Sequence, residues 1–260
     1  MKTVAAWFNQ QGIYWLVPLG ILVVWQALVV FGVIPQRILP APTSVLQTAY
    51  TLFTERGLAE DIAVSTARAL TGLLIGGGIG FVLGMLNGLF PVSEKLLDTT
   101  IQMIRTIPHL ALVPLVILWF GIDEKARIFL IALGVFFPMY VNTFMGIRYV
   151  DKGLIEMGRV YRLSTPSLFW NIILPGALPS ILLGVRLALG VMWLTLIVAE
   201  TIAANAGLGF LASQAREFMR TDVIVFIIVT YALLGKLADV IARLLERTLL
   251  RWHPNYQKAR

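Results

Sequence analysis

Long stretches without charge constrain this chain more than any other feature. Residues 3–36 and 69–93 contain no Asp, Glu, Lys or Arg. A helix of about 20 apolar residues crosses the hydrocarbon core of a bilayer, and both stretches are longer than that. Charged residues make up only 13% of the 260 residues, about half the usual share. This content is too low to cover a soluble domain or to keep a chain disordered, so we expect an integral membrane protein.

Further apolar segments predict an all-α membrane protein with six transmembrane helices in a single domain. The first span is too long for a signal-peptide core and has no A-x-A cleavage site, so we expect it to be uncleaved. Between the spans we expect one short amphipathic helix over residues 43–65 and a loop of small and polar residues over residues 201–221. The six expected spans are about 13–34, 66–90, 99–120, 126–147, 180–200 and 222–242.

The net charge of +7 predicts the orientation of these spans. If both termini lie in the cytoplasm, the inner segments hold eleven Lys and Arg residues and the outer segments hold seven. Lys and Arg are enriched on cytoplasmic loops, so we expect cytoplasmic termini and a cytoplasmic loop over residues 148–178. The chain has no cysteine, which excludes disulfides and thiolate metal sites, and we expect no metal.

Glycine recurs at every fourth position through the second expected span. Small residues at this spacing share one helix face and let another backbone approach closely. Gly184 continues a similar small-residue series in the fifth span. We interpret these glycines as helix-packing residues, with a sliding surface in a moving transporter as the alternative. The series in the second span consists of Gly72, Gly76, Gly80, Gly84 and Gly88.

The loop over residues 148–178 is too rich in helix signals to be a linker. Residues 154–163 predict one short helix. Thr165 is a suitable N-cap, Pro166 suits the first helical position, and Pro175 should stop the second helix. We therefore expect two short helices that lie parallel to the membrane. They could serve as an interfacial anchor or as a docking site for a cytoplasmic partner.

One pattern in this loop resembles a known motif. Glu156-Met157-Gly158, three residues, Arg162, nine residues and Ile172-Ile173-Leu174-Pro175 are similar to the EAA loop of ATP-binding cassette (ABC) importer permeases. The motif reads E-A-A, three residues, G, nine residues, I-x-L-P. Arg162 departs from it, because the family prefers glycine there, and a non-glycine residue with positive φ would be strained. The turn could differ in detail, or Arg162 could face the partner.

The resemblance covers nearly the whole chain. Segments such as RILPAPTSV and IQMIRTIPHLALVPLVILWFGID resemble permeases of the aliphatic sulfonate, taurine and nitrate importers, and most of all those for aliphatic sulfonates. This implies the type I ABC importer permease fold and a homodimer. It also implies two cytoplasmic ATPase subunits and a periplasmic or lipid-anchored binding protein. The residues implied in ATPase coupling are Glu156, Met157, Gly158, Arg159, Arg162, Ile172, Leu174 and Pro175.

Nucleotide chemistry is absent from the sequence. There is no G-x-x-x-x-G-K-[ST] motif, so the chain has no P-loop for nucleotide phosphates. It also lacks H-E-x-x-H and G-x-S-x-G, the signatures of metalloproteases and serine hydrolases. We expect a transport subunit that is not an enzyme and has no cofactor of its own, with ATP and Mg²⁺ bound by a partner ATPase.

Polar residues near the spans are candidates for the translocation path, because charge at membrane depth is costly. Arg105 and His109 are four residues apart on one helix face, which Pro108 breaks, and a guanidinium there would suit an oxyanion. Snorkelling of Arg105 and packing of His109 are the alternatives. For Asn142 and Thr195 the alternative is interhelical hydrogen bonding, and Glu200 could either pair with a basic residue or be a solvated span end. The candidates are Arg105, His109, Asn142, Thr195 and Glu200.

These features together predict a multi-pass permease of a bacterial inner membrane. The expected substrate class is aliphatic sulfonates, and taurine, nitrate or bicarbonate, and thiamine precursors are the alternatives within the family. A secondary transporter or a membrane scaffold without transport are rival classes. A secondary transporter should carry ion ligands near the midplane of the membrane, and the sequence offers few of them.

Overall fold

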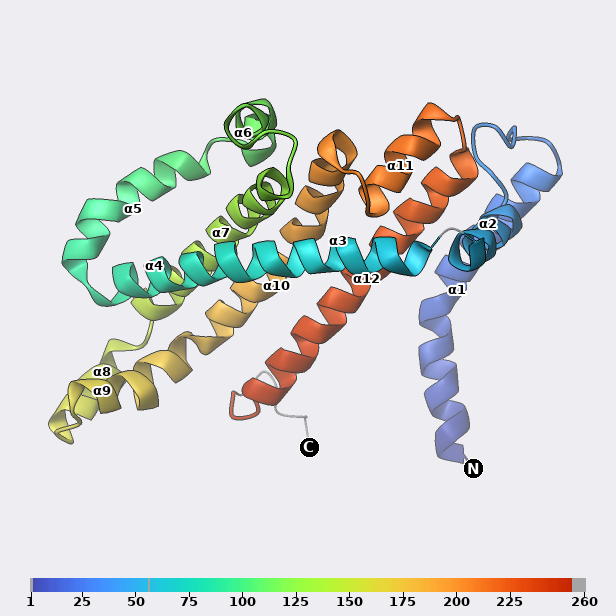
Figure 1. Cartoon of the computed structure of the whole chain (residues 1–260). Coiled ribbons are helices and arrows are strands. Elements are labelled where there is room, and N and C mark those ends of the chain that lie inside the picture. Colours follow the sequence, from blue (N-terminus) through green and yellow to red (C-terminus); the bar gives the residue numbers. More distant parts are fainter. Residues whose placement is uncertain (1, 56, 254–260) are drawn as a thin grey trace. The chain divides into compact units, whose positions relative to one another are not determined.

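The computed structural model describes the backbone of residues 2–55 and 57–253, and the side chains from Leu16 onward within those ranges except that of residue 203. Every regular element in these ranges is a helix, as the sequence predicts (Figure 1). The chain divides into two compact units, and each is described by itself. The smaller unit is Met1–Asp61 with Leu211–Thr230, and the larger is Ile62–Phe210 with Tyr231–Arg260.

The smaller unit contains α1 (Lys2–Val30), α2 (Pro42–Glu55) and parts of α11 (Leu208–Glu217) and α12 (Thr221–Leu249). The α1 helix ends before residue 34 because Gly32 adopts a φ of 72°, which favours glycine and breaks the helix. The side chain of Thr48 on α2 donates a hydrogen bond of 2.7 Å to Asp222 on α12.

Two expectations about short segments need correction. Residues 43–65 do not form one short helix, because α2 ends at Glu55 and α3 (Leu58–Gly72) begins after Gly57, whose φ is 66°. Residues 201–221 are not only a polar loop, since they include α11. Leu208 and Leu211 of this helix are buried, so burial of an apolar face stabilises a helix that the polar composition concealed.

The larger unit is built around α7 (Glu124–Arg148). It packs against α4 (Gly78–Leu89) and against α10 (Leu174–Ala203). The core includes Val135 of α7 and Leu196 of α10, each with 0% exposure. The α7 helix therefore joins α4 and α10 through closely packed, buried aliphatic side chains.

The glycine series faces α7. An added Cβ on Gly80 would lie 2.5 Å from the carbonyl oxygen of Phe136, and one on Gly84 would lie 2.6 Å from that of Tyr140. No real Cβ approaches so closely, so only glycine permits this backbone separation. The remaining three glycines meet α7 in the same way at Ile131, Ala132 and Ile147.

A π-helical turn keeps the glycine series on one face. It occupies Leu73–Gly77, between α3 and α4. In an α-helix, residues four apart drift by about 40°, so the five glycines would spread over about 160° around the axis. A π-turn accommodates one extra residue and rotates the later glycines back by about 100°. The series then spreads over about 80°, which lies within the width of one packed helix face.

Four helical segments in the described residues are long and apolar enough to cross a membrane. A fifth is added if α5 (Pro91–Arg105) and the segment His109–Phe120, which includes α6 (Val113–Phe120), count as one bent span. The described apolar part of α1, Leu16–Val30, is shorter. Six spans therefore remain a prediction. The four segments are Leu58–Leu89, Glu124–Arg148, Thr165–Ile202 and Thr221–Leu249.

The expected span over residues 99–120 is not one straight helix. The axis bends by 80° between Arg105 and His109. Pro108 explains the break, because it lacks an N–H group and disfavours the helical conformation at the residue before it. Arg105 and His109 therefore lie on different helices, and the expectation that they share one helix face is wrong.

Pro175 has the opposite effect to the one expected. The helix does not stop there: α9 (Thr165–Leu168), a π-helical turn at Phe169–Ile173 and α10 form a continuous helical segment over Thr165–Ile202. Pro175 lies in the first turn of α10, directly after the π-turn. The wider turn lets the chain continue past a residue that would otherwise clash with the preceding turn.

Candidate functional site

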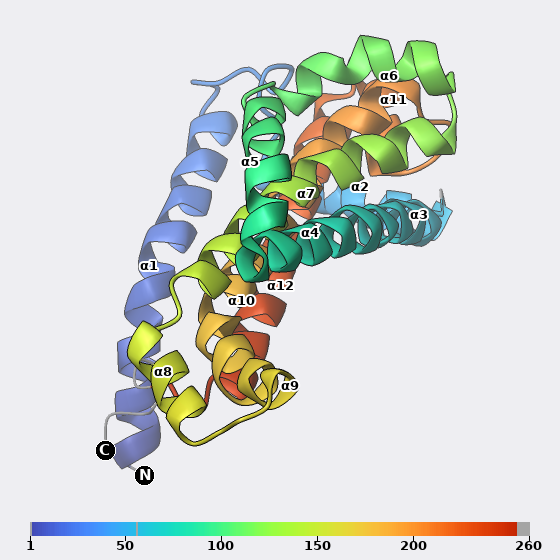
Figure 2. The ribbon, with the colours of Figure 1, turned by 90° about the vertical axis from the view of Figure 1, so that its left-hand side faces the viewer.

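The α8 helix (Lys152–Val160) begins the segment that resembles the EAA loop, two residues earlier than the sequence predicts. The side chain of Asp151 caps its N-terminus by accepting a hydrogen bond of 2.8 Å from the N–H of Gly153. Ser164, rather than the expected Thr165, caps α9. Figure 2 shows α8 and α9 at the end of the larger unit opposite α6.

Gly158 lets α8 pack against the helical segment that follows. An added Cβ would lie 2.6 Å from Leu168 Cδ1 and 2.7 Å from Ile172 Cδ1. A side chain at position 158 would therefore have to displace the ends of these two side chains. The spacing of Gly158 and Ile172 in the sequence pattern thus corresponds to a direct contact between them.

At Arg162, where the resemblance implies glycine, the backbone adopts a left-handed conformation. Its φ is 55°, in the left-handed region that is strained for a residue with a side chain. The N–H of Arg162 bonds to the carbonyl of Arg159 at 2.9 Å, and the N–H of Leu163 bonds to that of Gly158 at 3.0 Å. These bonds close the α8 helix, and the side chain of Arg162 is exposed.

The outer face of this segment is amphipathic and open. Val160 and Tyr161 are 80% and 76% exposed, and Trp170 is 65% exposed. Glu156 and Arg159 are exposed beside them. Large exposed apolar side chains next to charges are typical of a surface that another protein covers. We define residues 151–173 as the α8–α9 surface.

Two of the expected path residues meet inside the larger unit. His109 Nε2 lies 3.0 Å from the hydroxyl of Thr195, whose exposure is 1%. Gly134 makes room for this pair, because a Cβ there would lie 2.8 Å from the Thr195 hydroxyl and 3.2 Å from the imidazole. The pair connects the start of the helical segment His109–Phe120 with α10.

Two further candidates, Asn142 and Arg105, do not join that pair. The Asn142 amide donates a hydrogen bond of 2.8 Å to the carbonyl of Pro138 within α7, and Gly184 of α10 packs beside Asn142. Arg105 is exposed at the end of α5. The described residues contain no group of three His, Asp or Glu side chains that could hold a metal ion.

Glu200 is the most enclosed charge in the larger unit. Its side chain has 0% exposure and pairs with Arg68 at 2.8 Å. It also accepts hydrogen bonds from the hydroxyls of Ser65 and Tyr231 and from the N–H of Gly209. Of the two alternatives for this residue, pairing with a basic residue is confirmed and a solvated span end is wrong.

Arg68 extends this cluster to two more elements. Its guanidinium donates to both oxygens of Glu124, at 2.5 and 3.0 Å, and to the carbonyl of Ala206 at 2.6 Å. The cluster therefore fastens α3 and the start of α7 to the turn between α10 and α11. One signal in the sequence points to this cluster, since Arg68 and Glu200 are charges at the borders of apolar stretches and require partners.

Comparisons with known proteins identify the family. Residues 76–251 match the family described as "Binding-protein-dependent transport system inner membrane component". The chain is 59% identical to an Escherichia coli protein that bears the name of an aliphatic sulfonates transport permease, SsuC, over 93% of this chain and 92% of that protein. It is 36% identical to TauC, a taurine transport system permease of the same organism, over 91% and 88% of the two chains.

The fold is also found in a solved structure. An inward-facing structure of the MetNI methionine ABC transporter contains a chain that is 19% identical, with a TM-score of 0.54, covering 76% of this chain and 98% of that one. This likeness shows the fold alone, which is the type I importer permease fold. From the sequence matches, the chain belongs to the inner-membrane permease family of binding-protein-dependent ABC transporters.

Proposed function

We propose that this chain is the permease subunit of an ATP-driven importer of aliphatic sulfonates. The observation that carries the proposal is the 59% identity to a sulfonate permease over nearly the full length of both chains. Identity to the taurine permease is much lower, at 36%. Taurine, nitrate or bicarbonate, and thiamine precursors remain the alternative substrates within the family.

We propose that the α8–α9 surface docks the ATPase. Its exposed Val160, Tyr161 and Trp170 offer apolar area, and Glu156 and Arg159 offer charges for orientation. The continuous helical segment Thr165–Ile202 would carry movement away from this surface, because a packed helix moves as a rigid element. The ATPase would bind ATP and Mg²⁺.

The assembly would contain two copies of this chain, two ATPase subunits and a substrate-binding protein. In this arrangement six spans cross the inner membrane, and both termini and the loop over residues 148–178 lie in the cytoplasm. His109, Thr195 and Asn142 would contribute neutral polar groups to the path, with Arg105 near its end. Such groups bind an anion weakly, and conduction requires release as well as entry. Glu200 would have a structural role, since hydrogen-bond donors already surround its carboxylate.

ATP-dependent uptake by the reconstituted importer tests this proposal. The chain, its ATPase and its binding protein would be placed in proteoliposomes, and uptake of labelled ethanesulfonate would be measured with and without ATP. We expect uptake that requires both ATP and the ATPase. Competition by unlabelled taurine, nitrate and a thiamine precursor would rank the alternatives. Uptake without the ATPase would contradict the proposal and favour a secondary transporter.

A charge reversal tests the coupling surface. Glu156→Lys should abolish uptake and weaken co-purification of the ATPase, because it reverses an exposed charge on the α8–α9 surface. Glu60→Lys is the matched control, since Glu60 is also an exposed helical carboxylate and lies outside that surface. Equal loss of uptake in both variants would count against ATPase docking at α8.

A further inference from the structure

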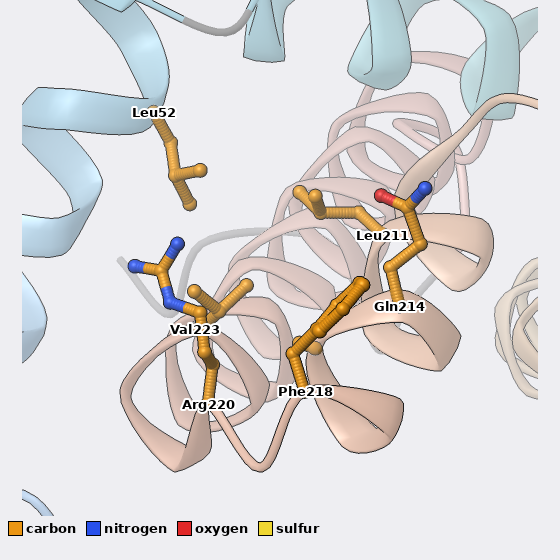
Figure 3. A pocket seen from close by; sticks show the side chains of 7 residues that line it. Leu52, Leu211, Gln214, Phe218, Arg220 and Val223 are labelled. Carbon is orange, nitrogen blue, oxygen red and sulfur yellow. The ribbon is translucent and has the colours of Figure 1, made fainter.

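The smaller unit contains a cavity that the transport proposal does not use. Its volume is about 310 Å³, at the lower end of the range for small-molecule sites. Side chains from α2, α11 and α12 and from the turn before α12 converge on it (Figure 3). The residues that line it are Leu52, Leu211, Gln214, Ala215, Phe218, Arg220 and Val223.

The floor of this cavity is aliphatic and deeply buried. Leu52 and Val223 are each 2% exposed, Ala215 is 4% exposed and Leu211 is 8% exposed. Phe218 lies at the rim and is 72% exposed. A floor of this kind favours a hydrocarbon chain, because contact with buried aliphatic groups removes apolar surface of the ligand from water.

The wall of the cavity supplies a cation. The side chain of Arg220 is 40% exposed. In the part of the chain that the structure describes, its guanidinium makes one hydrogen bond, from Nη2 to Asp222 at 3.1 Å. A guanidinium has five N–H donors, so most of them remain available. Asp222 is also held by the hydroxyl of Thr48 at 2.7 Å.

Arg220 also borders a second hollow, which is more polar. This hollow has a volume of about 510 Å³, and Arg37, Ser44 and Thr51 line it together with Arg220. The guanidinium of Arg220 therefore borders both hollows, and that of Arg37 lines the second one. With Asp222 as the one carboxylate among the residues that line the two hollows, the region keeps a net positive charge. An anionic head would therefore have water and donors on one side of Arg220 and an apolar floor on the other.

We propose that this cavity binds an alkyl anion, with the head on Arg220 and the chain on Leu52, Leu211 and Val223. The occupant we assign is a short alkanesulfonate. The sulfonate offers three acceptor oxygens to the paired donors of a guanidinium. The assignment rests on the proposed function, since an alkanesulfonate is the solute proposed for this importer. An anionic lipid shares the same chemistry and is the other source to test.

Binding to the full-length chain alone tests this site. The chain would be placed in nanodiscs of zwitterionic lipid, without ATPase or binding protein. Binding of 4,4,4-trifluorobutane-1-sulfonate would be followed by ¹⁹F NMR line broadening and compared with that of 4,4,4-trifluorobutan-1-ol. We expect the alcohol to bind at least about tenfold more weakly, because it cannot form the charge-assisted bonds to Arg220. Equal binding of the two probes would overturn the proposal.

Two variants and a control distinguish the contribution of the anionic head of the ligand from that of its hydrocarbon part. Arg220→Gln should weaken binding of the sulfonate about tenfold. Arg216→Gln should leave binding unchanged, since Arg216 is exposed on α11 and does not line the cavity. Ala215→Leu fills the cavity and should also weaken binding, although the guanidinium remains. Unchanged binding in both Arg220→Gln and Ala215→Leu would overturn the proposal.

The lipid source and the transport proposal are tested separately. If anionic phosphatidylglycerol in the nanodiscs abolishes binding of the probe, the cavity belongs to a lipid and our assignment to a sulfonate is wrong. If the probe binds but the complete importer takes up no sulfonate, only the proposed function fails. If uptake occurs but the probe does not bind, only this further inference fails.

Discussion

Two carboxylates in the helices of the larger unit are neutralised in different ways. Glu200 has 0% exposure, one cationic partner, Arg68, and three neutral donors. Asp239 on α12 is 24% exposed and has three cationic partners, Arg186, Lys236 and Arg243. The partners of Glu200 come mainly from distant segments, whereas two of the partners of Asp239 lie three and four residues away on its own helix.

The difference shows how burial determines the value of an ion pair. Breaking a buried pair leaves an uncompensated charge where solvent cannot reach it, which is strongly destabilising. An exposed pair is solvated and screened when it breaks, and it contributes little. The Glu200 cluster should therefore behave as a structural joint, and the Asp239 cluster as a surface feature sensitive to salt.

Removing Arg68 should have the largest effect. Arg68→Ala leaves the buried carboxylate of Glu200 without its cation, so the free energy of unfolding should fall by about 3–5 kcal/mol. Denaturant unfolding of the full chain in detergent micelles measures this loss. Arg186→Ala is the control, since it removes an arginine from Asp239. An equal loss in both variants would contradict the comparison.

Glu200→Gln should have a smaller effect. The amide keeps an acceptor for Ser65, and Arg68 keeps its pair with Glu124. Loss of hydrogen bonds to a charged group should lower the free energy of unfolding by about 1.5–3 kcal/mol. The same unfolding measurement applies. A loss greater than that of Arg68→Ala would show that the charge of Glu200 matters more than its cation.

Ser65→Ala tests the neutral donors of the buried cluster. The Ser65 hydroxyl donates to Glu200 at 2.8 Å and accepts from the N–H of Leu208 at 2.9 Å. Its removal leaves a buried N–H unsatisfied and should lower the free energy of unfolding by about 1–2 kcal/mol. Thr71→Ala is the control, since Thr71 is exposed and bonds to its own helix at Ala67. Equal effects would indicate that the cluster has no special dependence on Ser65.

Arg243→Ala should have the smallest effect. Asp239 keeps Arg186 and Lys236 as partners, so we expect almost no change in the thermal midpoint at physiological salt. At low salt the thermal midpoint should fall slightly, because screening of the ion pair is weaker there. Midpoints at several salt concentrations measure it. A large fall in the thermal midpoint that persists in high salt would show that Asp239 stabilises the fold as a buried charge such as Glu200 does.

Local patterns predicted the features that local geometry determines. The turn at Gly158 and Arg162 closes through bonds between residues only a few positions apart, so a local pattern can indicate it. The glycine series indicated close packing by its spacing, but not α7 as the partner. Proline gave opposite results: Pro108 accompanies an 80° bend, whereas the helix continues through Pro175 after a π-turn. The sequence rule for proline does not distinguish these cases, because the form of the surrounding turn decides whether the helix bends or continues.

The buried cluster could not be predicted in full. Arg68 and Glu200 are 132 residues apart, and no local spacing connects them. Charge at the border of an apolar stretch indicated only that each needs a partner. The tertiary arrangement selects Arg68, Ser65 and Tyr231 from among many polar groups, and the cavity beside Arg220 likewise depends on three helices that meet only in the fold.

The π-helical turn at Leu73–Gly77 has a consequence for the evolution of this helix. A π-turn holds one residue more than an α-helical turn does, and such an extra residue can arise from a single codon insertion. Deletion of that codon would return the turn to an ordinary α-helical one and leave Gly80, Gly84 and Gly88 at the same rotation about the axis, because the π-turn already offsets the rotation of about 100° that one residue adds. The same glycines would therefore still face α7. Relatives that lose one residue here can keep this packing without compensation elsewhere in the helix, so an alignment gap at this position would not by itself mark a change in helix packing.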